Sequence, residues 1–193
     1  MKIPSSSVVH IACLGLLTTL APVFAGGGPD GSSDYSRAGR WELGLPGKYW
    51  MGNDIIKNAL GTGFMVGYNF DEHWNVNLEG YCGIRLETEV DGIDGSGSIY
   101  TAIVNLEYYF KPGKFSPYLT ASTGFFNYDT KEDFNGSSAF SEVESGFSYG
   151  GGAGVRWAYN DHWFIKGSYH AFGTTTDGAK FMHGPEITIG YQF

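Results

Sequence analysis

From Arg40 onward the chain alternates apolar and polar residues with a period of two, over stretches of 8–13 residues. This period, with many aromatic and β-branched residues, predicts β-strands. Between residues 98 and 110, for example, Val104 and Leu106 fall on one face, while Asn105 and Glu107 fall on the other. The same pattern predicts eight strands, near residues 40–49, 63–70, 74–86, 98–110, 117–128, 147–159, 163–172 and 186–193.

The connections between these strands alternate in length. Those after the second, fourth and sixth strands are short, at residues 71–73, 111–116 and 160–162. Those after the first, third, fifth and seventh strands are long and polar, at residues 50–61, 87–97, 129–146 and 173–183. This asymmetry is typical of a transmembrane β-barrel, with short periplasmic turns and longer outer loops. We therefore expect an antiparallel, up-and-down barrel of eight strands in the bacterial outer membrane, with both termini in the periplasm.

The two faces of the strands support a membrane barrel over a water-soluble β-sandwich. The polar faces carry charges of both signs in mid-strand: Glu79, Arg85, Glu107, Arg156 and Lys166. An eight-stranded barrel has an interior that side chains just fill, so we expect these residues to form a polar network there. The apolar faces end in aromatic residues near the short turns: Trp41, Phe70, Trp74, Phe110, Tyr159 and Trp163. We expect these residues to form the aromatic girdle of a membrane interface.

Composition and charge add a predicted signal peptide, a tail and a limit on the partners of the chain. Residues 1–25 combine Lys2, a short apolar run and small residues before position 26, which predicts a cleaved signal peptide. Residues 26–39 are rich in Gly, Ser and Asp and are expected to be a flexible periplasmic tail, so that the barrel is residues 40–193. A formal net charge of -8 argues against a nucleic-acid partner, which needs a basic face.

The last strand carries the most specific resemblance. Its apolar residues Ile187, Ile189, Tyr191 and Phe193 alternate up to the chain end, and a glycine run at 150–154 lies in an earlier strand. Residues 40–193 resemble the small eight-stranded outer-membrane barrels of Gram-negative bacteria, of the OmpA, OmpX and opacity-protein type. The resemblance implies that the barrel assembly machinery recognises the last strand. We also expect contact with outer-membrane lipid and lipopolysaccharide. The loops are the candidate site for an extracellular ligand or a host surface, because binding residues often lie on loops held by a rigid scaffold.

Catalytic and metal sites are less well supported. Residues 146–150 match a G-x-S-x-G pattern, but no helix follows. Residues 70–74 and 159–163 echo each other and contain His73 and His162, which lack the further ligands that a metal needs. Ser168, His170 and Glu186 resemble the residue types of outer-membrane lipid A deacylases. In those enzymes the histidine precedes the serine, whereas here Ser168 precedes His170, and the alternation predicts that both side chains face the interior of the barrel.

We therefore expect a non-enzymatic barrel without cofactor or metal, which serves envelope integrity or surface interaction such as adhesion. A deacylase-like enzyme that uses Ser168, His170 and Glu186, and a narrow small-solute or ion channel, remain as alternatives. A wide pore is not expected, because porins need about 16 strands for an aqueous channel.

Overall fold

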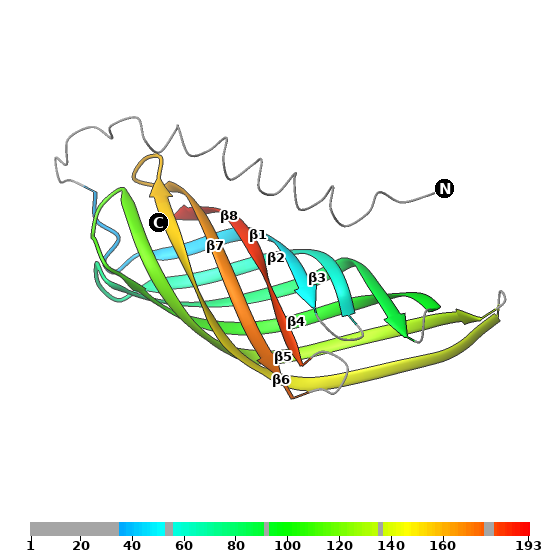
Figure 1. Ribbon diagram of the computed structural model, residues 1–193. Helices are drawn as coiled ribbons and strands as arrows, with labels where there is room; N and C mark the ends of the chain where they lie inside the picture. Colours follow the sequence, from blue (N-terminus) through cyan, green and yellow to red (C-terminus); the bar gives the residue numbers. More distant parts are fainter. Residues whose placement is uncertain (1–34, 53–55, 91–92, 135–136, 176–179) are drawn as a thin grey trace. The chain divides into compact units, whose positions relative to one another are not determined.

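The computed structural model describes residues 35–52, 56–90, 93–134, 137–175 and 180–193. Side chains are described in these ranges except at 56–57, 84–90, 93–97, 128–134 and 137–144. Eight antiparallel strands form a closed barrel in which each strand pairs with the next and β1 pairs with β8 (Figure 1). The strands are β1 (Trp41–Gly52), β2 (Ile56–Asn69), β3 (Trp74–Val90), β4 (Ile93–Tyr109), β5 (Phe115–Phe134), β6 (Ser137–Ala158), β7 (Trp163–Thr174) and β8 (Phe181–Gln192). The predicted eight-stranded, up-and-down barrel is confirmed.

Within the described ranges, no helix is long and apolar enough to cross a membrane.

Short turns connect the strands at one end of the barrel, which we call the turn side. They comprise residues 70–73, 110–114 and 159–162, close to the predicted positions. Asp71 and Asn160 shape two of them, because each Oδ1 atom accepts hydrogen bonds from the backbone N–H groups two and three residues later, at 2.7–2.9 Å. The short polar side chain thus closes the turn locally.

The opposite end, the loop side, differs from the prediction of four long loops. Most residues of the expected loops belong to strands, and β5 and β6 stay paired as far as Phe134 and Ser137. Figure 1 shows these two strands projecting beyond the others. Apolar–polar alternation reports which residues are buried, whereas backbone pairing continues wherever the partner strand continues. The strands therefore extend past the apolar pattern.

The expected flexible tail is also corrected in part. Residues 1–25, the predicted signal peptide, and residues 26–34 of the tail lie outside the described part of the chain. Residues 35–40 pack across the turn-side mouth of the barrel, and we call this segment the strap. Its central side chain, Arg37, is fully buried. A Gly- and Ser-rich composition predicted flexibility, but Tyr35 and Arg37 make contacts that the composition does not reveal.

Candidate functional site: the interior and outer face of the barrel

Ion pairs connect four strands in the turn-side half of the interior. The Nη2 atom of Arg156 on β6 lies 3.0 Å from Oε1 of Glu42 on β1. The ammonium of Lys166 on β7 lies 2.8 Å from Glu107 on β4 and 3.6 Å from Glu42. All four residues are at most 3% exposed. Because Glu42 contacts both cations and Lys166 contacts both carboxylates, the four residues form one connected network. Buried charges are tolerated when they are paired in this way.

A second cluster lies further from the turn side. The hydroxyl of Tyr81 on β3 is 2.9 Å from a carboxylate oxygen of Glu79 and 2.8 Å from one of Glu186 on β8. The ammonium of Lys48 on β1 is 3.3 Å from the same Glu186 oxygen and 4.4 Å from the ring centre of Phe172. This cluster therefore links three strands through one tyrosine hydroxyl and one ion pair.

Asparagine side chains extend the first network around the wall. The hydroxyl of Ser122 donates to the first of four asparagines, each of which donates through Nδ2 to the next acceptor at 2.8–3.2 Å. In order, the chain runs Ser122, Asn105, Asn77, Asn75, Asn69 and Glu42. Because all donors point the same way, each bond polarises the next, and the last is strengthened by the carboxylate charge.

Four of the five side chains expected in the polar interior are buried there, namely Glu79, Glu107, Arg156 and Lys166. The fifth, Arg85, lies outside the residues whose side chains are described. The structure adds Glu42 and Lys48, which were not among the five predicted residues. A signal was present, because both alternate in β1 with the outward-facing Leu43 and Leu45. Charged residues on the polar face of the first strand could therefore have been predicted as interior.

The loop-side half of the interior is mostly apolar, with Thr101 and Ser148 as buried polar residues, whereas a polar interior was expected. The buried side chains there include Trp50, Ile99, Phe126, Phe172 and Met182. The cavity among them has room for about one water molecule at most. Trp50 and Met182 fall in segments that were expected to be loops, so their place in the interior was not predicted. Packed side chains close this half of the barrel.

The structure brings Ser168, His170 and Glu186 together inside the barrel, but not in the order of a catalytic triad. Nε2 of His170 lies 2.9 Å from Oγ of Ser168 and 3.7 Å from Oε2 of Glu186. A catalytic histidine uses one ring nitrogen for the nucleophile and the other for the orienting acid. Here both contacts fall on one nitrogen, while the buried Nδ1 atom has no hydrogen-bond partner in the described part of the chain.

The two ends of the strap are tied to distant parts of the barrel. The Tyr35 hydroxyl donates to Oε1 of Gln192 on β8 at 3.1 Å and accepts a hydrogen bond from Nη1 of Arg156. Nη1 of Arg40 donates to the carbonyl oxygen of Asp161 in the β6–β7 turn at 2.8 Å. The strap thus contacts the ionic network inside the barrel and a turn at its rim.

Arg37 occupies the middle of the strap. Its guanidinium lies 3.8 Å from the ring centre of Tyr109, and both Nε, at 2.8 Å, and Nη2 donate to the carbonyl oxygen of Glu72. Burial lowers the pKa of this guanidinium, while the nearby Tyr109 and Glu42 favour its charged form. An arginine remains protonated in proteins, so the mouth of the barrel holds a buried cation.

The two histidines of the echoed turns are fixed to the barrel wall. Nδ1 of His73 and Nδ1 of His162 lie 2.8 and 3.1 Å from backbone carbonyl oxygens of an adjacent strand. The pKa of Asp71 is lowered, because its carboxylate accepts hydrogen bonds from the backbone N–H groups of His73 and Trp74, which stabilise the charged form. Across the described residues, no group of three His, Cys, Asp or Glu side chains is placed to hold a metal ion.

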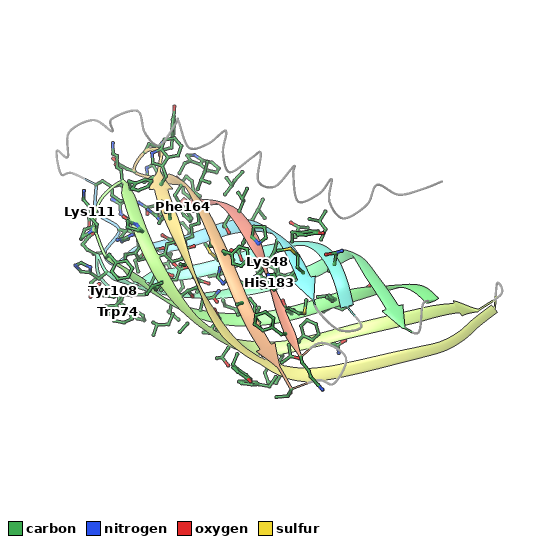
Figure 2. All side chains as sticks on the ribbon, in the orientation of Figure 1. Lys48, Trp74, Tyr108, Lys111, Phe164 and His183 are labelled. Atoms are coloured by element: carbon green, nitrogen blue, oxygen red, sulfur yellow. The ribbon has the colours of Figure 1, made fainter. Side chains whose placement is uncertain are left out.

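The outer face of the barrel is apolar. Among the described residues, 26 large hydrophobic side chains are exposed, far more than a water-soluble surface tolerates as one continuous patch. The aromatic residues expected at the turn side all face outward and are 41–68% exposed: Trp41, Phe70, Trp74, Phe110, Tyr159 and Trp163. Figure 2 shows Trp74 beside Tyr108, with their ring centres 4.8 Å apart.

A second set of outward aromatic residues lies toward the loop side and was not predicted. It comprises Tyr100, Phe125, Phe147, Tyr149 and Phe181. On β5, Phe115 and Phe125 are ten residues apart, and about 3.3 Å per residue with a tilt of about 40° gives roughly 25 Å between the two levels. That spacing equals the height of the apolar band of outer-membrane barrels, which is about 25 Å.

The last strand also turns its apolar residues outward. Ile187, Ile189 and Phe193 are exposed, and Tyr191 is half-buried. Trp41 and Phe193 exchange backbone hydrogen bonds of 3.1 and 3.0 Å, which close the barrel between β1 and β8. The end of the chain is therefore both part of the apolar outer surface and one side of the closing seam.

A closed eight-stranded barrel with an apolar outer band and a polar, ion-paired interior defines the class of outer-membrane barrels. The family model of the outer membrane protein beta-barrel domain matches residues 11–193. The chain belongs to this family, and its place is the bacterial outer membrane. A comparison with curated proteins finds no match.

Several solved structures share the fold. The outer membrane protein OprG of Pseudomonas aeruginosa has 14% sequence identity, with 82% of this chain and 98% of OprG covered at a TM-score of 0.60. Ail, the attachment invasion locus protein of Yersinia pestis, has 20% identity, with 81% and 99% covered at a TM-score of 0.54. Neisserial surface protein A has 14% identity, with 80% and 97% covered at a TM-score of 0.57. At these identities the likeness concerns the fold.

Proposed function

We propose that this protein is a non-enzymatic surface-interaction protein of the outer membrane, and that its loop side faces the exterior. In this arrangement both termini lie in the periplasm and lipopolysaccharide surrounds the outer part of the apolar band. The outward-facing residues of the last strand, Ile187, Ile189, Tyr191 and Phe193, would be recognised by the barrel assembly machinery.

The open edge of β6 is the observation that carries the proposal. Strand β6 pairs with β5 from Ser137 onward, but with β7 only from Ser148 onward. A further contact, from the backbone N–H of Thr175 to the carbonyl of Phe147, lies just above that point. Among the described residues, positions 137–146 therefore pair on one side only. An unpaired edge of this length is a template for another strand.

Charge indicates the kind of partner. Residues 128–145 contain five acidic residues and one basic residue, a formal net charge of -4. An extended, basic segment of a partner polypeptide would gain main-chain hydrogen bonds from the edge and electrostatic attraction from these acids. One protein of the same fold, Ail, is by its name an attachment and invasion protein, so the fold is compatible with such a role.

The interior supports a non-enzymatic role without a conducting path. The contacts of His170 do not form a proton relay, and its side chain lies inside the barrel, away from lipid. The apolar half around Trp50, Phe126 and Met182 obstructs passage from the loop side. These two features of the interior favour binding at the surface over catalysis or conduction.

The test is to shorten the projecting strands. Asn127 and Ser145 face each other, with 2.9 Å between Nδ2 and Oγ, so a two-residue turn can replace residues 128–144. Cells that display the shortened barrel should bind immobilised polypeptides and cultured cells at least tenfold less than cells with equal amounts of wild type. A control variant with Glu142→Gln and Glu144→Gln keeps the edge and separates charge from strand pairing. Unchanged binding by the shortened barrel would refute the proposal and favour a role in envelope integrity.

A further inference from the structure

The strap makes contacts that closing a turn does not require. Arg37 is fully buried, although it precedes the first strand, and its guanidinium carbon lies 3.8 Å from the ring centre of Tyr109. A chain end in a periplasmic tail would be expected to keep such a charge in water. The contacts of Arg37 therefore need an explanation beyond the fold of the barrel itself.

We propose that the turn-side mouth of the barrel is a binding site for a guanidinium group, which Arg37 fills from within the same chain. Filling of this site holds the strap across the mouth and closes the polar half of the interior. The inference goes beyond the proposed surface interaction, because it concerns the opposite end of the barrel.

The chemistry of the site suits a guanidinium better than an ammonium. The ring of Tyr109 forms one wall, and a planar cation stacks on such a face. The carbonyl oxygen of Glu72 accepts from two nitrogen atoms of the same guanidinium, Nε and Nη2. A lysine ammonium is a compact point charge without this fork and cannot make both contacts in one plane.

Charge inside the barrel gives a second, independent reason. Leaving histidine aside, the described buried side chains include four carboxylates and four cations: Glu42, Glu79, Glu107 and Glu186, with Arg37, Lys48, Arg156 and Lys166. Of these carboxylates, Glu42 lies near enough to Arg37 to favour its charged form, so the mouth suits a cation.

The residues next to Arg37 explain how a bound guanidinium keeps the strap across the mouth of the barrel. Ser36 donates through Oγ to a carboxylate oxygen of Glu72, so two successive strap residues hold the β2–β3 turn. The Tyr35 hydroxyl reaches Gln192 on β8, next to the seam with β1. The strap therefore spans from one turn to the closing seam, and a bound guanidinium keeps it in place.

Chemical rescue tests the proposal. The Arg37→Ala variant, refolded in lipid vesicles, should lose at least about tenfold in the equilibrium constant for folding, measured by urea titration. Millimolar ethylguanidinium should restore much of this loss in a saturable manner, while ethylammonium at the same concentration should not. Arg37→Lys should fall between wild type and Arg37→Ala. Lys111→Ala is the control, because this cation is exposed in the β4–β5 turn and is not part of the strap.

Amide hydrogen exchange keeps the test decisive if a variant folds poorly. In the wild type, the backbone N–H groups of residues 39 and 40, which donate to carbonyl oxygens of Asn69 and Arg37, should exchange slowly. In Arg37→Ala they should exchange at least tenfold faster, and ethylguanidinium should slow them again. An unchanged folding constant and exchange in Arg37→Ala would overturn the proposal. Equal rescue by ethylammonium would overturn the guanidinium site.

Discussion

Replacing Arg156 by Met should destabilise the barrel by removing one partner of a buried ion pair. The guanidinium makes contacts of 3.0 Å with Glu42 and 2.6 Å with Gln192, and its side chain is fully buried. Removing one partner of such a pair costs about 3–5 kcal/mol, because the other charge is left without compensation. Glu42 keeps Lys166 at 3.6 Å, so we expect the low end, about 3 kcal/mol, or roughly a 150-fold fall in the folding constant.

The pairing itself is isolated by a double-mutant cycle. Adding Glu42→Gln to Arg156→Met removes the uncompensated carboxylate, so the double variant should be more stable than the two single losses would predict. We expect a coupling energy of about 2 kcal/mol, within the usual range for residues in one network. Arg40→Met is the control for loss of a partly exposed arginine.

The assay is urea unfolding of the refolded protein in lipid vesicles, followed by tryptophan fluorescence and by the shift in gel mobility of the folded barrel. Arg156→Met within about 0.5 kcal/mol of wild type would show that the guanidinium is not buried in the interior. Additive losses in the cycle, within the same margin, would show that Arg156 and Glu42 do not interact.

Three further predictions concern the seam, a turn and the chain end. Gly184→Ala would make a Cβ atom overlap with the carbonyl oxygen of Tyr49 across the β1–β8 seam, so urea unfolding should show a loss of roughly 3 kcal/mol or more. Gly167→Ala, whose Cβ atom would have nothing within 4 Å, should stay within about 0.5 kcal/mol of wild type. The pKa of Asp71 is lowered below its usual value of 3.8 in the fold, so its stabilisation is present above that pH and is lost as the pH falls through the lowered pKa. The advantage of wild type over Asp71→Asn in urea should therefore shrink below about pH 4, and a constant difference would contradict this account. Deleting Phe193 should lower the amount of folded barrel in the outer membrane, measured by surface labelling, and normal levels would remove the proposed assembly signal.

The strand count and the interior positions could be read from the sequence because both depend on local geometry. Successive side chains of a strand point to opposite faces, so the period of two around Glu107 and Lys166 places both in the interior without knowledge of their partners. The short turns were equally visible, because Asp71 and Asn160 bond to their own backbone within three residues. Local signals of this kind survive in any tertiary context that keeps the strand.

The ends of the strands could not be predicted in the same way. Beyond the apolar band, the pairing of β5 with β6 no longer separates an apolar face from a polar one, so alternation ends before the hydrogen bonds do. Part of the apolar half of the interior was missed for the same reason. Trp50 and Met182 belong to the last residues that the strands contribute to the interior, in segments whose composition resembled loops.

The sequence by itself predicted an eight-stranded outer-membrane barrel with a charged interior, since period, turn chemistry and composition are local properties. The tertiary structure alone decided which charges meet. Arg156 and Glu42 are 114 positions apart, and closure of the barrel brings them to 3.0 Å. It also decided that the strap enters the mouth, because the site for Arg37 exists only once Tyr109 and the β2–β3 turn stand side by side. A contact between distant segments depends on the closed shape, which no single stretch of sequence contains.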